Sequence, residues 1–78
     1  TDIPEADFEE GIEAFDLFHR VGLAKSRGAA RRLIEGGGAY VNGRKVASFN
    51  ERLSIAEAED GQLTLRSGKK NYHLVRIR

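Results

Sequence analysis

The residues with the clearest chemistry in this sequence are closely spaced cations between positions 25 and 32. They are Lys25, Arg27, Arg31 and Arg32. Guanidinium and ammonium groups are the side chains that pair with phosphate oxygens. Ser26 stands among them, and its hydroxyl can accept a backbone N–H as a helix N-cap. A helix that begins there would also offer its first backbone amides to an anion. Such a surface suits a polyanion.

A short helix must position these cations. Apolar residues recur at helical spacing from Ala29 to Ile34 and form a single stripe, which predicts a helix over residues 26–35. The arginines fall outside this stripe, so they are expected to face solvent. Three consecutive glycines at 36–38 then end the helix.

A hairpin is predicted directly after this helix. Residues 39–41 are expected to form a short strand, and Asn42-Gly43 is a strong signal for a two-residue turn. The return strand over 44–47 would carry two further cations, Arg44 and Lys45. The hairpin therefore extends the basic surface.

Upstream, the sequence predicts a linker and a first helix. Residues 1–10 are acidic, and Pro4 disfavours helix at the residue before it, so we expect a linker from a preceding domain there. Phe8 would either pack back on the domain or join an interface with the preceding one. Apolar positions at three- and four-residue spacing predict a helix over about 12–21. The folded domain is then expected over 11–78.

The last third predicts a second hairpin. Alternating apolar residues indicate strands over 62–66 and 71–77, joined by a turn that holds Lys69 and Lys70. The final strand has apolar residues on both of its faces, so the sequence does not decide which face is buried. The predicted fold class is α+β, with two short helices packed on a small, mostly antiparallel sheet.

Length and composition exclude several classes of protein. A chain of 78 residues is one domain, and without cysteine it has no disulfide and no thiolate metal site. It has no apolar run long enough to span a bilayer and no signal-peptide pattern. His19 and His73 are far apart and lack carboxylate or cysteine neighbours, so we predict no metal site and no catalytic residue.

The net charge of +1 conceals strong segregation along the chain. Residues 1–18 carry seven acids and no Lys or Arg, whereas residues 19–47 carry seven bases against Glu35 alone. Residues 62–78 carry five bases and no acid. A phosphate backbone responds to the local patch rather than to the total. We expect the acidic segment mostly to face away from the basic one; the alternative is that they pair inside the fold.

The segment from Gly22 to Gly43 resembles the RNA-binding module of small-subunit ribosomal protein four. That pattern runs G-L-A-x-S-[KR]-x-x-A-R-x-L-I-x-x-G-x-V-x-V-N-G, and about a dozen positions agree in type and spacing. Gly28 weakens the start of the helix, and Ala29 stands where Glu or Gln often completes a capping box. The resemblance implies the S-four-like, or alpha-L, RNA-binding motif.

The end of the chain narrows the resemblance. The run Ser67 to Val75, SGKKNYHLV, is similar to the R-G-K-K-x-Y-x-L-[IV] ending of bacterial tyrosyl-tRNA synthetases, with Ser67 in place of the usual arginine. Those enzymes carry this module as their last domain, after an acidic connection like residues 1–10. The resemblance covers about residues 12–78 and implies a fragment of a longer protein.

This resemblance implies a tRNA-binding domain that is not itself catalytic. In the family, the domain holds the anticodon stem and long variable arm of the cognate tRNA. Tyrosine activation with ATP and magnesium belongs to another domain, whose HIGH-like and KMSKS-like signatures do not occur in this sequence. The expected parent is a cytoplasmic, homodimeric tyrosine–tRNA ligase. The fragment is expected to be monomeric, with no cofactor, small-molecule substrate or membrane partner. Carried over by position, the implied RNA-binding residues are Lys25, Ser26, Arg27, Arg31, Arg32, Arg44, Lys45, Lys69, Lys70 and Asn71.

Two alternatives stay open. The first motif also occurs in ribosome-associated proteins and pseudouridine synthases, so the module can belong to another RNA-binding protein. In a protein-interaction module, by contrast, Phe8, Tyr40 and Phe49 would be exposed docking points and the acidic head would bind a basic partner. Salt separates the two classes, because RNA affinity falls steeply with salt and apolar docking does not.

Overall fold

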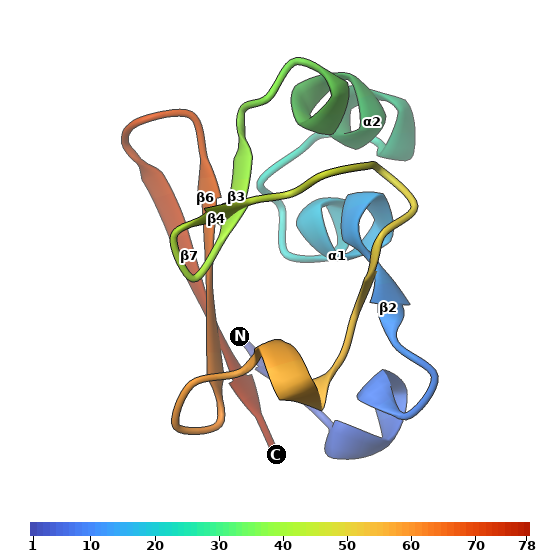
Figure 1. The fold of residues 1–78 in the computed structure, drawn as a ribbon, viewed down its shortest axis with the longest axis vertical. Coiled ribbons are helices and arrows are strands. Elements are labelled where there is room, and N and C mark those ends of the chain that lie inside the picture. The colour runs from blue at the N-terminus through green and yellow to red at the C-terminus, as the bar shows by residue number, and fades with distance from the viewer.

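The computed structural model describes all residues 1–78 and shows two short helices on one face of a five-stranded sheet (Figure 1). The sheet order is β1-β7-β6-β3-β4, and every pair is antiparallel except β1 with β7. The predicted α+β class is confirmed. The elements are β1 (Asp2–Ile3), η1 (Glu5–Phe8), β2 (Ile12–Glu13), α1 (Ala14–Arg20), α2 (Arg27–Glu35), β3 (Ala39–Val41), β4 (Arg44–Lys45), β5 (Arg52–Leu53), η2 (Ile55–Glu57), β6 (Gln62–Ser67) and β7 (Asn71–Ile77).

Helix α2 begins and ends where its sequence predicts. The Ser26 hydroxyl accepts a hydrogen bond from the Ala29 N–H at 3.0 Å, so the N-cap is formed. Ala30 and Ile34 are buried on the inner side. Gly37 adopts a φ of +79°, which glycine reaches without steric cost and which stops the helix.

Both predicted hairpins are present. Asn42 and Gly43 have φ angles of 49° and 84°, the pair of positive values that a type I′ turn requires. β4 ends at Lys45, two residues before the predicted end of its strand. In β7 the open question of the buried face is answered: Val75 is buried in the hydrophobic core, while Tyr72 and Leu74 are exposed on the other side.

The first ten residues differ from the linker that their composition predicts. β1 pairs in parallel with β7, with Asp2 opposite Arg76 and Ile3 opposite Ile77. Ile3 and Phe8 are each only 1% exposed and belong to the hydrophobic core. The acids between them are exposed, so two buried side chains anchor a segment whose average composition is that of a linker. Its connection to a preceding domain stays a prediction.

The first helix is shorter than its apolar pattern predicts. Ile12 and Glu13 form β2, which pairs with β5, and α1 begins only at Ala14. Glu13 is extended, with φ −61° and ψ 136°. The Ala14 N–H donates to the Glu51 carbonyl at 2.8 Å, so pairing with the β5 segment replaces the first helical turn. The apolar pattern with a period of 3.6 residues describes only neighbours along the chain, so it does not predict pairing with a distant strand.

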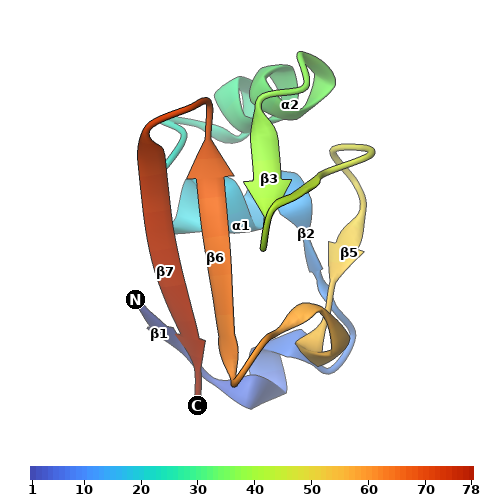
Figure 2. The same cartoon turned by 60° about the vertical axis from the view of Figure 1, so that its left-hand side comes forward.

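One hydrophobic core joins buried residues of the helices and of the strands. Both helices lie on the same side of the sheet (Figure 2). Phe18 is fully buried and Leu33 packs at the edge of the same cluster, where α1 and α2 contact each other. Neither helix has the length and apolar character needed to cross a bilayer. The buried residues are Ile3, Phe8, Ile12, Ala14, Leu17, Phe18, Ala24, Ala30, Ile34, Ala39, Val41, Val46, Leu53, Leu63, Leu65 and Val75.

Candidate nucleic-acid interface

The start of α2 gathers the first group of predicted RNA-binding residues. Lys25, Ser26 and Arg27 are exposed there. Arg32 lies in the last turn and is also exposed, and its Nη1 reaches back to 3.6 Å from the position that a Cβ on Gly28 would take. The Ser26 hydroxyl is occupied by the Ala29 amide, so its capping role is established by geometry. The amides of the first helical residues lack acceptors within the helix and point toward solvent, which favours an anion at this end.

Arg27 is paired with an acid of α1. Its Nε donates to Asp16 Oδ1 at 3.0 Å, and both side chains stay substantially exposed. Arg20 is paired in the same way with Asp7, at 2.7 Å. The expectation that the acidic segment mostly faces away from the basic one is therefore wrong for these two carboxylates. The packing of α1 beside α2 brings Asp16 to Arg27, a proximity that charge blocks along the chain do not reveal.

Arg31 rests on an aromatic side chain from the loop after β4. Its Cζ lies 4.2 Å from the centroid of the Phe49 ring, within range of a cation–π interaction. Phe49 in turn meets Phe15 edge-on, with ring centroids 5.8 Å apart. The guanidinium is exposed yet positioned, because its platform is fixed to α1.

Arg44 stands apart from the other predicted residues. Its Nη2 donates to Glu51 Oε2 at 2.6 Å and to Glu57 Oε2 at 3.2 Å. The hydrogen bond with Arg44 lowers the pKa of Glu51, against the opposing effect of burial, and the same bond raises the pKa of Arg44. Two carboxylates thus occupy this guanidinium, which ties the β3–β4 hairpin to the segment that follows it.

A second basic group lies beyond the C-terminal end of α2. Lys69, Lys70 and Asn71 are exposed at the β6–β7 turn, which Figures 1 and 2 place at the same end of the molecule as α2. The Gly68 N–H donates to the Gly38 carbonyl at 2.7 Å and holds this turn against the start of β3. Lys45 Nζ lies 3.1 Å from the position that a Cβ on Gly37 would take. Its charge therefore sits near the C-terminus of α2, where the helix dipole favours a cation.

Sequence reasoning missed Arg66. Its Cζ lies 3.9 Å from the centroid of the Tyr40 ring. Both residues alternate along their strands with buried neighbours, so they lie on the face of the sheet away from the core. Tyr40 and Arg66 are directly opposite each other in the β3–β6 pairing. The predicted strands already contained both residues, but their register, which local patterns do not give, was needed to bring them together.

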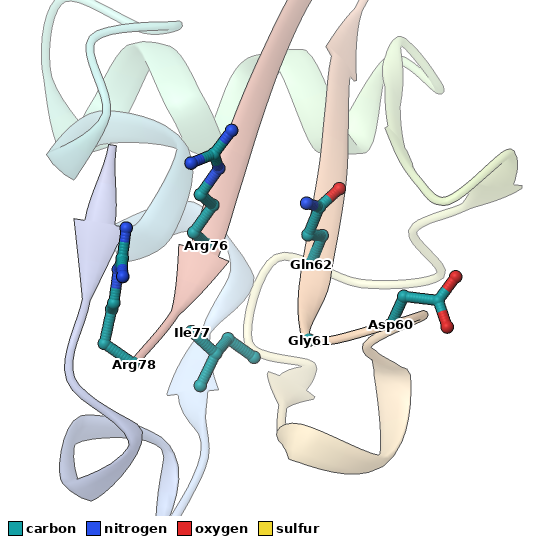
Figure 3. Close-up of a pocket in the computed structure, with 6 residues that line it drawn as sticks. All are labelled: Asp60, Gly61, Gln62, Arg76, Ile77 and Arg78. Atoms are coloured by element: carbon teal, nitrogen blue, oxygen red, sulfur yellow. The ribbon is translucent and has the colours of Figure 1, made fainter.

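A shallow pocket of about 240 Å³ lies at the other end of the sheet (Figure 3). Arg76 and Arg78 lie on one side of it and Asp60 on the other. Ile77 is its only hydrophobic lining residue. Small-molecule sites are usually larger and mainly apolar, and Arg78 already pairs with Asp2 at 3.3 Å. The chain also contains no group of three or more His, Cys, Asp or Glu side chains that could hold a metal ion.

Comparison with known proteins matches this chain along almost its whole length. The family model described as "Tyrosine–tRNA ligase SYY-like C-terminal domain" matches residues 1–75. A tyrosine–tRNA ligase of Desulfosudis oleivorans is 50% identical over 78 residues, which is 100% of this chain and 18% of that protein. Those of Desulfatibacillum aliphaticivorans and Roseiflexus castenholzii are 48% and 42% identical, over 94% and 96% of this chain and 17% and 18% of theirs.

The chain thus spans under a fifth of the length of these relatives, and it corresponds to the domain that the family model describes. The match begins at the first residue, so it includes the segment that β1 and Phe8 tie to the core. The predicted resemblance to tyrosyl-tRNA synthetases is confirmed, and the chain belongs to the family of tyrosine–tRNA ligase C-terminal domains.

Proposed function

We propose that this chain binds tRNA and serves as the tRNA-gripping part of a tyrosine–tRNA ligase. The proposed contacts are phosphates of a tRNA with a long variable arm. The rest of such an enzyme, a cytoplasmic homodimer, would join tyrosine to tRNA with ATP and magnesium. The chain itself holds RNA and performs no chemistry. Its proposed contact residues are Lys25, Arg27, Arg31, Arg32, Lys45, Lys69, Lys70 and Asn71, with Ser26 shaping the helix start.

The observation that carries the proposal is the convergence of two basic groups at one end of the fold. One group surrounds the start of α2, and the other lies at the β6–β7 turn and beside Gly37. α2 has nine residues, so its two ends lie roughly 14 Å apart at 1.5 Å per residue. A separation of that size suits phosphates of one folded RNA. Arg44 is left out of the contact set because Glu51 and Glu57 occupy it.

The protein-interaction alternative is not favoured by the structure. Phe8 is buried in the core, Phe49 packs against Phe15 beneath Arg31, and Tyr40 lies under the guanidinium of Arg66. The three docking points that this alternative requires are therefore occupied within the chain. A ribosome-associated protein or a pseudouridine synthase is not favoured either, because the similar proteins are tyrosine–tRNA ligases.

A salt series of binding isotherms tests the proposal. With four to six phosphates neutralised, log affinity should fall against log salt with a slope of roughly −3 to −5. Replacing Lys69 and Lys70 together with Gln should make that slope shallower by about 1.4 to 1.8. Arg76→Gln is a charge control, because Arg76 pairs with Gln62 at the far end of β7 from the turn. It should leave the slope unchanged.

Competition by tRNAs with long and short variable arms tests whether the bound tRNA is one with a long variable arm. The long-armed tRNA should compete better. A flat salt response, or equal loss of affinity in the Arg76→Gln variant and the double Lys variant, would remove the basis for an RNA surface at this end. Calorimetric titration with tyrosine or ATP should give no heat beyond dilution.

A further inference from the structure

The face of the sheet that the helices leave open carries a row of alternating cationic and aromatic side chains. Across four strands the register aligns Lys45 with Tyr40, Tyr40 with Arg66, and Arg66 with Tyr72. At an inter-strand spacing of about 4.8 Å the row is roughly 14 Å long. No acidic residue interrupts it. Figures 1 and 2 show that both helices lie on the opposite face.

Tyr72 is the exposed aromatic member of this row. Its residue surface is 61% exposed, the largest fraction among the large hydrophobic residues of the chain, and its neighbour Leu74 is 39% exposed. Packing in the core does not explain why Tyr72 and Leu74 are apolar, because β7 contributes Val75 to the core from its other face. A tyrosine ring offers an apolar plane with a polar tip, which suits stacking on a nucleotide base.

Arg66 is fixed beside Tyr72 at some cost. Its guanidinium lies over Tyr40 with Cζ 3.9 Å from the ring centroid, and its buried Nε has no hydrogen-bond partner. An unsatisfied buried donor opposes this conformation, and the stacking on Tyr40 holds the group there in spite of it. The result is a cation positioned one strand away from an exposed aromatic ring.

We infer that this row is a second RNA contact, in which an unpaired base of the bound tRNA stacks on Tyr72 while Arg66 and Lys45 pair with its flanking phosphates. The inference rests on the proposed function and deepens it. Charge complementarity selects RNA as the occupant, because the row holds two cations and no acid. Continuity supports the same choice: Tyr72 follows Lys70 and Asn71 directly, and Lys45 belongs to both surfaces. Alternation of cations with aromatic rings is how proteins hold single-stranded nucleotides.

The affinity of the 78-residue chain for a tRNA transcript with a long variable arm tests the inference. Tyr72→Ala should weaken binding roughly fivefold or more, with an unchanged salt slope because no ionic contact is lost. Tyr72→Phe should restore most of the affinity, since the ring remains. Arg66→Gln should make the slope shallower by about 0.7 to 0.9. The melting temperature of Tyr72→Ala should match wild type, because an exposed side chain is removed.

A direct readout comes from chains with isotope-labelled tyrosine. The chain has two tyrosines, so its ring signals are readily assigned by substitution. Addition of the tRNA should shift the Tyr72 ring protons upfield, as stacking under a base requires, and shift those of the covered Tyr40 ring less. Leu74→Ala, on the same face, should bind tRNA like wild type.

The outcomes separate this inference from the proposed function. If Tyr72→Ala binds like wild type while the double Lys69 and Lys70 variant is weakened, the second contact is overturned and the proposed function stands. If the wild type does not bind tRNA, both are overturned. If Leu74→Ala and Tyr72→Ala weaken tRNA binding equally, the apolar character of this face matters and base stacking on Tyr72 is overturned. If Tyr72→Ala abolishes self-association instead of RNA binding, this face is an apolar docking surface for protein.

Discussion

Arg31 and Phe49 form a stacked pair across the gap between α2 and the loop after β4, with Cζ 4.2 Å from the ring centroid. The ring contacts Phe15 of α1 on another side. A cation in the proposed RNA surface is therefore positioned by a side chain that carries no charge. Removing the platform should alter RNA binding without removing a phosphate contact.

The first prediction compares two substitutions at this pair. Phe49→Leu should weaken tRNA binding severalfold and leave the salt slope near its wild-type value, because all cations remain. Arg31→Ala should weaken binding, make the slope shallower by about 0.7 to 0.9, and lower the free energy of unfolding by about 0.5–1 kcal/mol. Salt-dependent isotherms and denaturant unfolding measure both effects. An Arg31→Ala variant that binds like wild type would assign this arginine a purely structural role.

The second prediction concerns the acid that restrains Arg27. Asp16→Asn removes the carboxylate that lies 3.0 Å from Arg27 Nε and so releases the guanidinium for phosphate. We expect severalfold tighter tRNA binding and a slope steeper by about 0.7 to 0.9. Stability should change by less than about 1 kcal/mol, as for other exposed ion pairs.

A matched control is available for Asp16. Asp7→Asn makes the same change of charge at the carboxylate paired with Arg20, which lies outside the proposed contact set. It should change affinity less than Asp16→Asn. Equal gains from both variants would mean that only net charge matters, and no gain from Asp16→Asn would place Arg27 outside the interface.

The third prediction tests whether the first ten residues belong to the fold. Phe8 is 1% exposed, so Phe8→Ala should lower the free energy of unfolding by about 3–5 kcal/mol through loss of a buried aromatic ring. Thermal and denaturant melts measure the loss. Glu9→Ala, one residue away and exposed, is the control and should change stability by less than about 0.5 kcal/mol. A Phe8→Ala variant that melts with wild type would restore the linker interpretation.

The fourth prediction follows from the lowered pKa of Glu51. A carboxyl whose pKa is lower in the folded chain contributes stability above its unfolded pKa, about 4.5, and loses that contribution as pH falls through the folded pKa. Glu51→Gln should therefore melt earlier than wild type at pH 6, by about 1 kcal/mol in stability. The difference should shrink as pH is lowered below about 4.

Melting curves from pH 6 to pH 3 for wild type and Glu51→Gln test this expectation. Glu59→Gln is a suitable control, since Glu59 is exposed and forms no ion pair. If the difference in stability between wild type and Glu51→Gln stays constant across this range, the hydrogen bonds that the side chain accepts, and not its charge, support the loop.

Local patterns were sufficient for the elements that surround the proposed RNA surface. Ser26 and the glycines after Glu35 mark the ends of α2, and the Asn42-Gly43 pair produces the hairpin turn, because each of these effects acts within a few residues. The resemblance to a family then supplied the proposed use of the fold, which no periodicity contains.

Contacts between distant segments were beyond the reach of those patterns. Ile3 reaches the core through pairing with residues more than seventy positions away, and Ile12 leaves the first helix to pair with Leu53. The same limit applies to the site. The partners of Arg27 and Arg44, and the stack of Arg66 on Tyr40, follow from packing and register rather than from spacing.

The parallel pairing of β1 with β7 also sets an order of events during synthesis. Asp2 and Ile3 are among the first residues of this segment to leave the ribosome, yet their partners Arg76 and Ile77 are among its last. Until then Ile3 has no strand to cover it, and the sheet lacks one edge. Chaperones should therefore stay bound to the beginning of the nascent segment. They should be released only when its final residues emerge. A stalled chain shortened by five residues would keep its N-terminal strand sensitive to protease.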